Sequence, residues 1–125
     1  WTPRAVAPHK LKKQPGVETL TLELVRTTDI LADVAVHPLR PRCVVGFAAE
    51  TGDDAELARY ARGKLERKRV DFICANRVGV AGSGFEAEDN ALQVFWNGGD
   101  RRFGPAPKAR LAEQLLGFIG ERMPA

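Results

Sequence analysis

The sequence predicts an α/β fold built on a mostly parallel sheet. Residues 42–47 and 70–75 are short, nearly continuous apolar stretches, the pattern of strands that are buried on both faces. Between them, apolar residues recur at helical spacing over residues 54–69. Strand, helix and strand in this order make a βαβ unit, whose two strands are parallel. We therefore expect a Rossmann-like, three-layer α/β/α arrangement in residues 1–125, which amount to one domain.

The N-terminal part of the chain is expected to be mostly irregular. Residues 1–17 carry three prolines and several lysines and predict a loop. Residues 18–26 alternate leucine with polar residues and predict a half-buried strand. Thr28 is the expected N-cap of a short helix through about Val36, with Asp29 favourable in its first turn.

The crossover helix is expected to begin at Asp53 and Asp54 and to continue to about Arg69. Its predicted apolar stripe consists of Leu57, Tyr60, Ala61 and Leu65. Lys64 and Lys68 lie four residues apart on one face, so both ammonium groups could reach one polyanion. The alternative is a solvated helix face, since several other charged residues surround the two lysines.

The C-terminal part predicts a strand, a turn and a helix. Glycines in residues 79–84 indicate a loop, residues 90–96 a strand, and residues 97–100 a tight turn that sends the chain back. Pro107 begins a final amphipathic helix. The side chains expected to face inward are Leu111, Leu115, Leu116, Ile119 and Met123.

Composition narrows the classes of function. A net charge of +3 and a pI near 9.1 suit an anionic small ligand, but are a thin basis for nucleic-acid binding. No apolar run is long enough to span a membrane. Cys43 and Cys74 are the only cysteines; we expect them to be free and buried, which favours a reducing cytoplasm. Cys and His are too few for a convincing metal site.

Five motifs occur in order along the chain. They are Val6 to Lys13, Gly46 to Thr51, the Lys64/Lys68 pair, Asp71 to Asn76, and Gly84-Phe85 with Asp89 to Leu92. In this order and spacing they resemble the phosphopantothenoylcysteine synthetase domain of the bacterial coenzyme A biosynthesis bifunctional protein. The resemblance runs over residues 1–96. It implies that residues 1–125 are the C-terminal portion of that domain, whose Gly-rich N-terminal half comes before the position of Trp1.

The resemblance implies roles for three lysines. Lys64 and Lys68 match lysines that hold the phosphates of a bound cytidine triphosphate (CTP). Lys10 matches a lysine that contacts the nucleotide and is needed when cysteine attacks the activated acid, so Lys10 is the expected catalytic residue. Its neighbours alone would place Lys10 in an exposed basic loop.

The same resemblance implies contacts to the nucleoside. A segment that contacts it largely through backbone atoms is matched by Thr28, Asp29, Ile30 and Leu31, although the family usually has proline where Thr28 stands. Phe47 matches a position at the base pocket. The physical alternative for Phe47 is an aromatic side chain that caps the core at a strand end. The family usually has Asp where Arg77 stands, so Arg77 receives no role.

The implied activity is that of a ligase in coenzyme A biosynthesis. It would join 4'-phosphopantothenate to L-cysteine with CTP, through an acyl-cytidylate intermediate. Mg²⁺ would accompany CTP, whereas FMN would belong only to a decarboxylase domain that can precede this one. The family is dimeric, and residues 18–26 and 91–103 are expected to form an antiparallel arm that pairs two subunits of a homodimer.

Two other classes of function stay open at this stage. The fragment could be an assembly module that dimerises and supplies lysines without chemistry of its own; such a module would show no saturable heat with CTP. It could also be a basic nucleic-acid-binding domain, with steeply salt-dependent affinity for any duplex. The chain lacks the aromatic or arginine stripes that would favour the latter.

Overall fold

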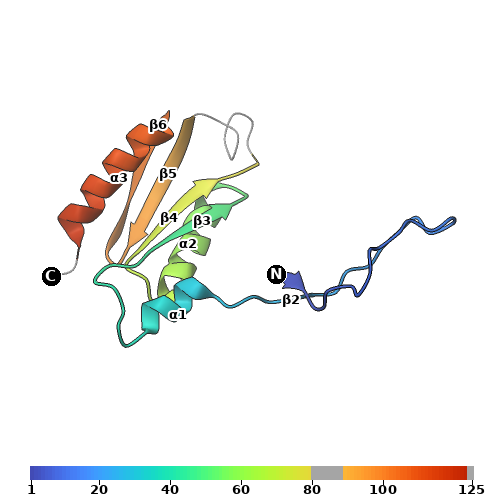
Figure 1. Ribbon diagram of the computed structural model, residues 1–125. Helices are drawn as coiled ribbons and strands as arrows, with labels where there is room; N and C mark the ends of the chain where they lie inside the picture. The colour runs from blue at the N-terminus through green and yellow to red at the C-terminus, as the bar shows by residue number, and fades with distance from the viewer. Residues whose placement is uncertain (80–88, 124–125) are drawn as a thin grey trace.

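The computed structural model describes residues 1–79 and 89–123 and shows a four-stranded main sheet with three helices, and a projecting N-terminal segment that holds a two-stranded sheet (Figure 1). In chain order the elements are β1 (Thr2–Pro3), β2 (Leu24–Val25), α1 (Ile30–Val36), β3 (Val45–Glu50), α2 (Asp54–Lys68), β4 (Phe72–Arg77), β5 (Asp89–Trp96), β6 (Gly99–Pro107) and α3 (Lys108–Arg122). No helix in these described ranges is long and apolar enough to cross a membrane.

The main sheet is mixed, with strand order β3-β4-β5-β6. Only β3 and β4 are parallel, in a register from Val45 opposite Phe72 to Glu50 opposite Arg77. The pairs β4/β5 and β5/β6 are antiparallel. The expectation of a mostly parallel sheet is therefore wrong. Among the described residues, α2 is the one helix that joins two neighbouring strands, and a tight turn before Gly99 makes β6 run back along β5.

Helices cover both faces of this sheet (Figure 1). On one face, α1 and α2 enclose a core that includes Leu57, Ala61, Leu65, Ile73 and Phe95. On the other face, α3 encloses a core that includes Phe72, Cys74, Val94, Phe103 and Phe118. Side chains alternate along each strand, which explains how neighbouring residues of β4 and β5 serve different cores. The α/β class is therefore confirmed, with helices packed on a four-stranded mixed sheet.

Helix α2 agrees closely with its prediction. Asp53 is its N-cap and forms a capping box with Glu56: each side chain accepts a hydrogen bond from the other residue's backbone N–H, at 2.9 and 3.1 Å. The helix ends at Arg69, which is left-handed with φ of 55°. Tyr60 does not belong to the buried stripe, because its side chain is exposed.

Two helix details differ from expectation. The N-cap of α1 is Asp29 rather than Thr28, because the Asp29 Oδ1 atom accepts from the Ala32 backbone N–H at 3.1 Å. Leu116 in α3 and Met123, which follows its last residue, are exposed instead of inward. The buried positions of α3 are Leu111, Leu115, Phe118 and Ile119, which share one stripe at three- and four-residue spacing.

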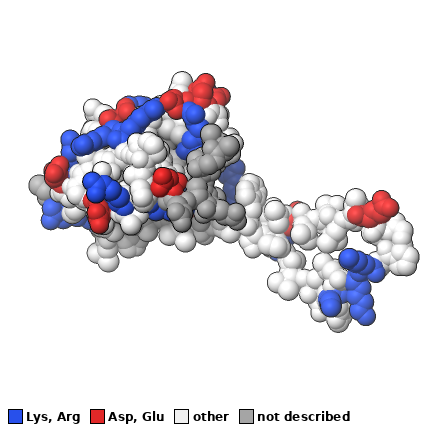
Figure 2. Space-filling model, turned by 90° about the horizontal axis from the view of Figure 1, so that it is seen from above, with Lys and Arg blue, Asp and Glu red and all other residues white. Residues whose placement is uncertain are grey.

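The N-terminal segment is an arm that projects from the body (Figures 1 and 2). Its predicted half-buried strand over residues 18–26 is wrong: only Leu24–Val25 pairs, with Thr2–Pro3, and Leu20 and Leu22 are exposed. Residues 18–26 lie in this arm as expected, but residues 91–103 do not. They form the β5/β6 hairpin inside the main sheet, because their apolar side chains, Val94 among them, pack against α3.

Candidate functional site

Lys64 and Lys68 lie on one face of α2 and each forms an ion pair with a carboxylate. Lys64 Nζ bonds to Glu50 Oε1, and Lys68 Nζ lies 3.1 Å from Asp29 Oδ2. These side chains are partly buried: 30% of Lys64, 17% of Glu50 and 23% of Lys68 is exposed. We call Lys64, Lys68, Glu50 and Asp29 the lysine cluster.

The two carboxylates reach the lysine cluster from different elements. Glu50 is the last residue of β3, and alternation places its side chain on the same face as Ala48, which packs in the core beneath α2. Asp29 precedes α1 and caps it. The Ala32 backbone N–H, and then Lys68, lower the pKa of the Asp29 carboxyl below its ordinary value of 3.8.

Close packing holds α1 against β3 beside the cluster. A Cβ atom at Gly46 would lie 2.6 Å from the end of the Leu31 side chain and 2.9 Å from the end of Ile73, so glycine lets both side chains pack closely on β3. Leu31 therefore lies against the sheet, whereas Ile30 is 72% exposed. Thr28 and Asp29 line a hollow of about 360 Å³ together with Trp1 and neighbouring residues. The predicted segment 28–31 thus adjoins Lys68, as a shared ligand would require.

Phe47 is not part of this grouping. It alternates with buried Gly46 and Ala48, so its ring points to the face of the sheet opposite α2. The side chain is 68% exposed, which does not fit the alternative in which Phe47 caps the core. Phe47 lies on β3, the outer strand of the described sheet, as an exposed aromatic group.

Lys10 is also separate from the lysine cluster within one chain. It is exposed and belongs to the arm, which extends away from α2 (Figure 1). Where the arm's two segments meet, the Arg4 backbone N–H donates to the Glu23 carbonyl at 2.9 Å, and their side chains form an ion pair at 2.6 Å. A single chain therefore brings together Lys64, Lys68 and the 28–31 segment, but not Lys10.

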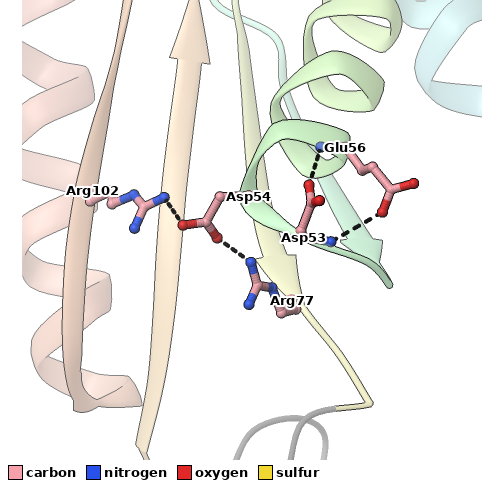
Figure 3. Close-up of polar contacts among 5 residues, drawn as sticks. All are labelled: Asp53, Asp54, Glu56, Arg77 and Arg102. Atoms are coloured by element: carbon pink, nitrogen blue, oxygen red, sulfur yellow. Dashed lines mark hydrogen bonds and ion pairs between the residues drawn. The ribbon is translucent and has the colours of Figure 1, made fainter.

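Sequence reasoning gave no role to several charged residues that the structure groups. The sequence prediction includes Glu50 only as a member of the Gly46 to Thr51 motif. A carboxylate at the end of a strand, directly before a basic helix, could have indicated an ion pair with that helix. A second group surrounds Asp54, as shown in Figure 3. We call Asp54, Arg77 and Arg102 the arginine cluster. The motif Gly84-Phe85 lies outside the described residues.

Comparison with known proteins identifies relatives along nearly the whole chain. Residues 1–123 match the family described as "DNA/pantothenate metabolism flavoprotein C-terminal domain". The chain is 44% identical over 123 residues to the "Coenzyme A biosynthesis bifunctional protein CoaBC" of Vibrio cholerae, covering 98% of this chain and 30% of that protein. Identity to the protein of the same name from Escherichia coli K12 is 45% over 112 residues, or 89% of this chain and 27% of the relative.

Solved structures agree with the fold. The crystal structure of the C-terminal domain of a protein with that name has a TM-score of 0.60 at 26% identity, covering 78% of this chain and 43% of that one. The DNA/pantothenate metabolism flavoprotein from Streptococcus pneumoniae has a TM-score of 0.69 at 21% identity, covering 89% and 46%. The chain thus spans less than half of these structures and less than a third of the relatives above.

Proposed function

Because the chain belongs to the family of DNA/pantothenate metabolism flavoprotein C-terminal domains, we propose that it is the C-terminal portion of a phosphopantothenate–cysteine ligase that uses CTP. The relatives named for coenzyme A biosynthesis support this proposal. The complete domain would have a Rossmann-like sheet, to which β3 and β4 contribute a parallel pair.

The chemistry requires activation of a carboxylate, because hydroxide is a poor leaving group. The carboxylate oxygen of 4'-phosphopantothenate attacks the α-phosphorus of CTP, which forms an acyl-cytidylate and releases pyrophosphate. The L-cysteine amine then attacks the acyl carbon. Its proton is lost, an amide forms and CMP leaves. The protein's part in these steps is to position the reactants and to stabilise developing negative charge.

The observation that carries the proposal is the lysine cluster. Two ammonium groups from successive turns of α2 lie beside the 28–31 segment, where one polyanion can contact both. One ammonium–phosphate contact at ~4 Å is worth roughly 4 kcal/mol at an effective dielectric near 20, before desolvation. Without nucleotide, the carboxylates of Glu50 and Asp29 form ion pairs with these ammonium groups. A bound triphosphate would take the place of the carboxylates.

Mg²⁺ would enter this site bound to the phosphates of the nucleotide. In the described ranges, no group of three or more His, Cys, Asp or Glu side chains could hold a metal ion. A magnesium ion that arrives with CTP brings phosphate oxygens and water as ligands, and needs few from the protein. FMN has no proposed role in these residues and is assigned only to a possible preceding decarboxylase domain.

Lys10 acts in this proposal across a homodimer. The arm exposes apolar side chains, Leu20 and Leu22 among them, that a second subunit would cover. An arm that packs on the other subunit can carry Lys10 to that subunit's nucleotide, where its charge would stabilise the acyl-phosphate centre. This arrangement accounts for the separation of Lys10 from the lysine cluster within one chain.

The same separation favours a second candidate function, a non-catalytic assembly fragment. In that case the arm would dimerise, but the lysine cluster would bind no nucleotide. Titration calorimetry of the full chain with Mg²⁺ and CTP separates the two candidates, because only the ligase predicts saturable heat. Acidic and basic side chains are mixed on the body surface in Figure 2, which does not favour a nucleic-acid-binding domain.

The mutational test of the ligase uses Lys64→Gln and Lys68→Gln in the full-length ligase, of which this chain is proposed to be the C-terminal portion. Each change should lower kcat/KM for CTP by at least about tenfold, because a charge-assisted contact to phosphate is lost. The matched control is Arg59→Gln, since Arg59 lies on the same helix with its guanidinium 4.9 Å from the Tyr60 ring centroid. Turnover that is unchanged in both lysine variants would end the triphosphate assignment.

A further inference from the structure

The arginine cluster lies at the beginning of α2, whereas the lysine cluster includes residues near its end. Asp54, the first residue of α2, accepts from Arg77 at the end of β4 and from Arg102 in β6 (Figure 3). Each carboxylate oxygen binds one guanidinium, and the Arg102 contact is 2.5 Å. Strand β5 lies between β4 and β6, so the arginines converge on Asp54 from strands that are not neighbours.

A cavity of about 310 Å³ adjoins the arginine cluster where α2 begins beside β4, β5 and β6. Its described apolar lining on the α2 side of the sheet includes Leu57 and Ala75, while Asn90 and Gln93 are uncharged polar groups. Ligand pockets range upward from about 300 Å³. This cavity therefore suits a small ligand with a hydrocarbon part.

The charge in the cavity is unbalanced. Among the described lining residues, Arg77, Arg102 and Asp54 are the charged ones, so two cations face a single carboxylate. A guanidinium stays protonated and offers five N–H donors in a planar fork. One surplus positive charge matches one carboxylate on a ligand, whose planar shape also fits a guanidinium bidentately.

Stabilising the fold is a poor account of this arrangement. The exposed fractions of the side chains are 58% for Asp54, 60% for Arg102 and 35% for Arg77. Ion pairs at such exposure contribute little to folding, because water and salt screen them. The same exposure leaves the guanidinium groups open to a competing anion.

We propose that this cavity binds the carboxylate of a small acyl compound. The carboxylate takes donors of Arg77 and Arg102 in competition with Asp54, and the hydrocarbon part lies against Leu57 and Ala75. The proposal uses none of the residues of the lysine cluster. It therefore holds whether or not that cluster binds a nucleotide.

The test measures binding of hexanoate to the full chain by ligand-observed NMR titration. Hexanamide, which has the same hydrocarbon part without the charge, and inorganic phosphate are the comparison probes. Arg102→Gln should weaken hexanoate binding about tenfold, because a charge-assisted hydrogen bond is lost. Arg101→Gln is the matched control: Arg101 is the adjacent residue, and its guanidinium lies over the Phe103 and Phe118 rings on the α3 side.

Asp54→Asn gives the sharper result, because the proposal predicts a change in the opposite direction. Removing the competing carboxylate should strengthen hexanoate binding severalfold, whereas a purely structural ion pair predicts no gain. Asp53 still caps α2 in this variant, and Asp54→Ser serves the same purpose if the asparagine variant does not fold. Equal binding of hexanamide, tighter binding of phosphate, or no response to Arg102→Gln would each overturn the proposal.

Discussion

The two ionic clusters on α2 differ in how their charges are matched. In the lysine cluster each cation has its own carboxylate, so the group is neutral before any ligand arrives. In the arginine cluster two cations share one carboxylate, and a positive charge is left over. In the neutral lysine cluster a ligand must displace the carboxylates, which requires an anion with several charges. In the arginine cluster the surplus positive charge can bind a ligand that has a single carboxylate. The balance between cations and carboxylates in a cluster therefore says more about its ligand than the number of basic residues does.

The largest effect on stability is expected from a residue that packs α2, the helix of both clusters, against the sheet. Leu57 is 4% exposed, packs in the core beneath α2 and lines the cavity of the arginine cluster. Leu57→Ala should lower the free energy of unfolding by about 2–5 kcal/mol, because it leaves a cavity under the helix. Urea denaturation followed by tryptophan fluorescence measures this change. Leu116→Ala, at a leucine that is 70% exposed, should stay within about 0.5 kcal/mol; similar losses in both variants would contradict the assigned core.

An intermediate effect is expected from removing one carboxylate of the lysine cluster. Glu50→Gln frees Lys64 from its competing anion and should raise the affinity for inorganic pyrophosphate by about tenfold. Calorimetric titration gives the affinity directly. Glu66→Gln, at an exposed glutamate on the same helix, is the control. An unchanged or lower affinity in Glu50→Gln would show that Glu50 positions Lys64 without competing for it.

The smallest effect concerns the two aspartates at low pH. The pKa values of Asp29 and Asp54 are both lowered, so the stability that each contributes is present above the ordinary pKa of 3.8 and is lost as pH falls through the lower folded pKa. The leading causes differ: a backbone N–H of Ala32 for Asp29, and the Arg102 guanidinium for Asp54.

Carboxyl ¹³C titration by NMR can separate these causes. Arg102→Gln should return the Asp54 pKa most of the way to its ordinary value, because its largest cause is removed. Lys68→Gln should leave the Asp29 pKa clearly lowered, since the helix-capping hydrogen bond remains. If the lysine change alone restored the Asp29 pKa, the capping interpretation would be wrong.

Local signals in the sequence predicted the helices better than the sheet. Helix α2 was predicted within a residue or two because its caps, Asp53 and Arg69, and its leucine spacing are all encoded nearby in the chain. The direction of β5 and β6 depends on pairing between distant segments, which periodicity does not report. The same limit explains why residues 91–103 were assigned to an arm. The predicted inward set of α3 includes Leu116 and Met123 and leaves out Phe118. It was chosen by apolar residue type and not by the angular position of each residue around the helix.

The site was predictable only in part. Four-residue spacing on a helix correctly placed Lys64 and Lys68 on one face, and the predicted family is confirmed by a match over residues 1–123. Their partners Glu50 and Asp29 lie on other elements, so only packing reveals the ion pairs. Arg77 and Arg102 are likewise far apart in sequence and meet only at Asp54. The functional roles of all the predicted site residues remain predictions: Lys10, Thr28, Asp29, Ile30, Leu31, Phe47, Lys64 and Lys68.

Strand β3 has a practical consequence for handling this polypeptide. In the described residues it hydrogen-bonds only to β4, so its other side presents a row of backbone donors and acceptors, and Phe47 is exposed along it. Such an edge can recruit a strand from another molecule. Residues 1–125 expressed alone should therefore self-associate through this edge as concentration rises, and a charged substitution such as Phe47→Lys should improve solubility.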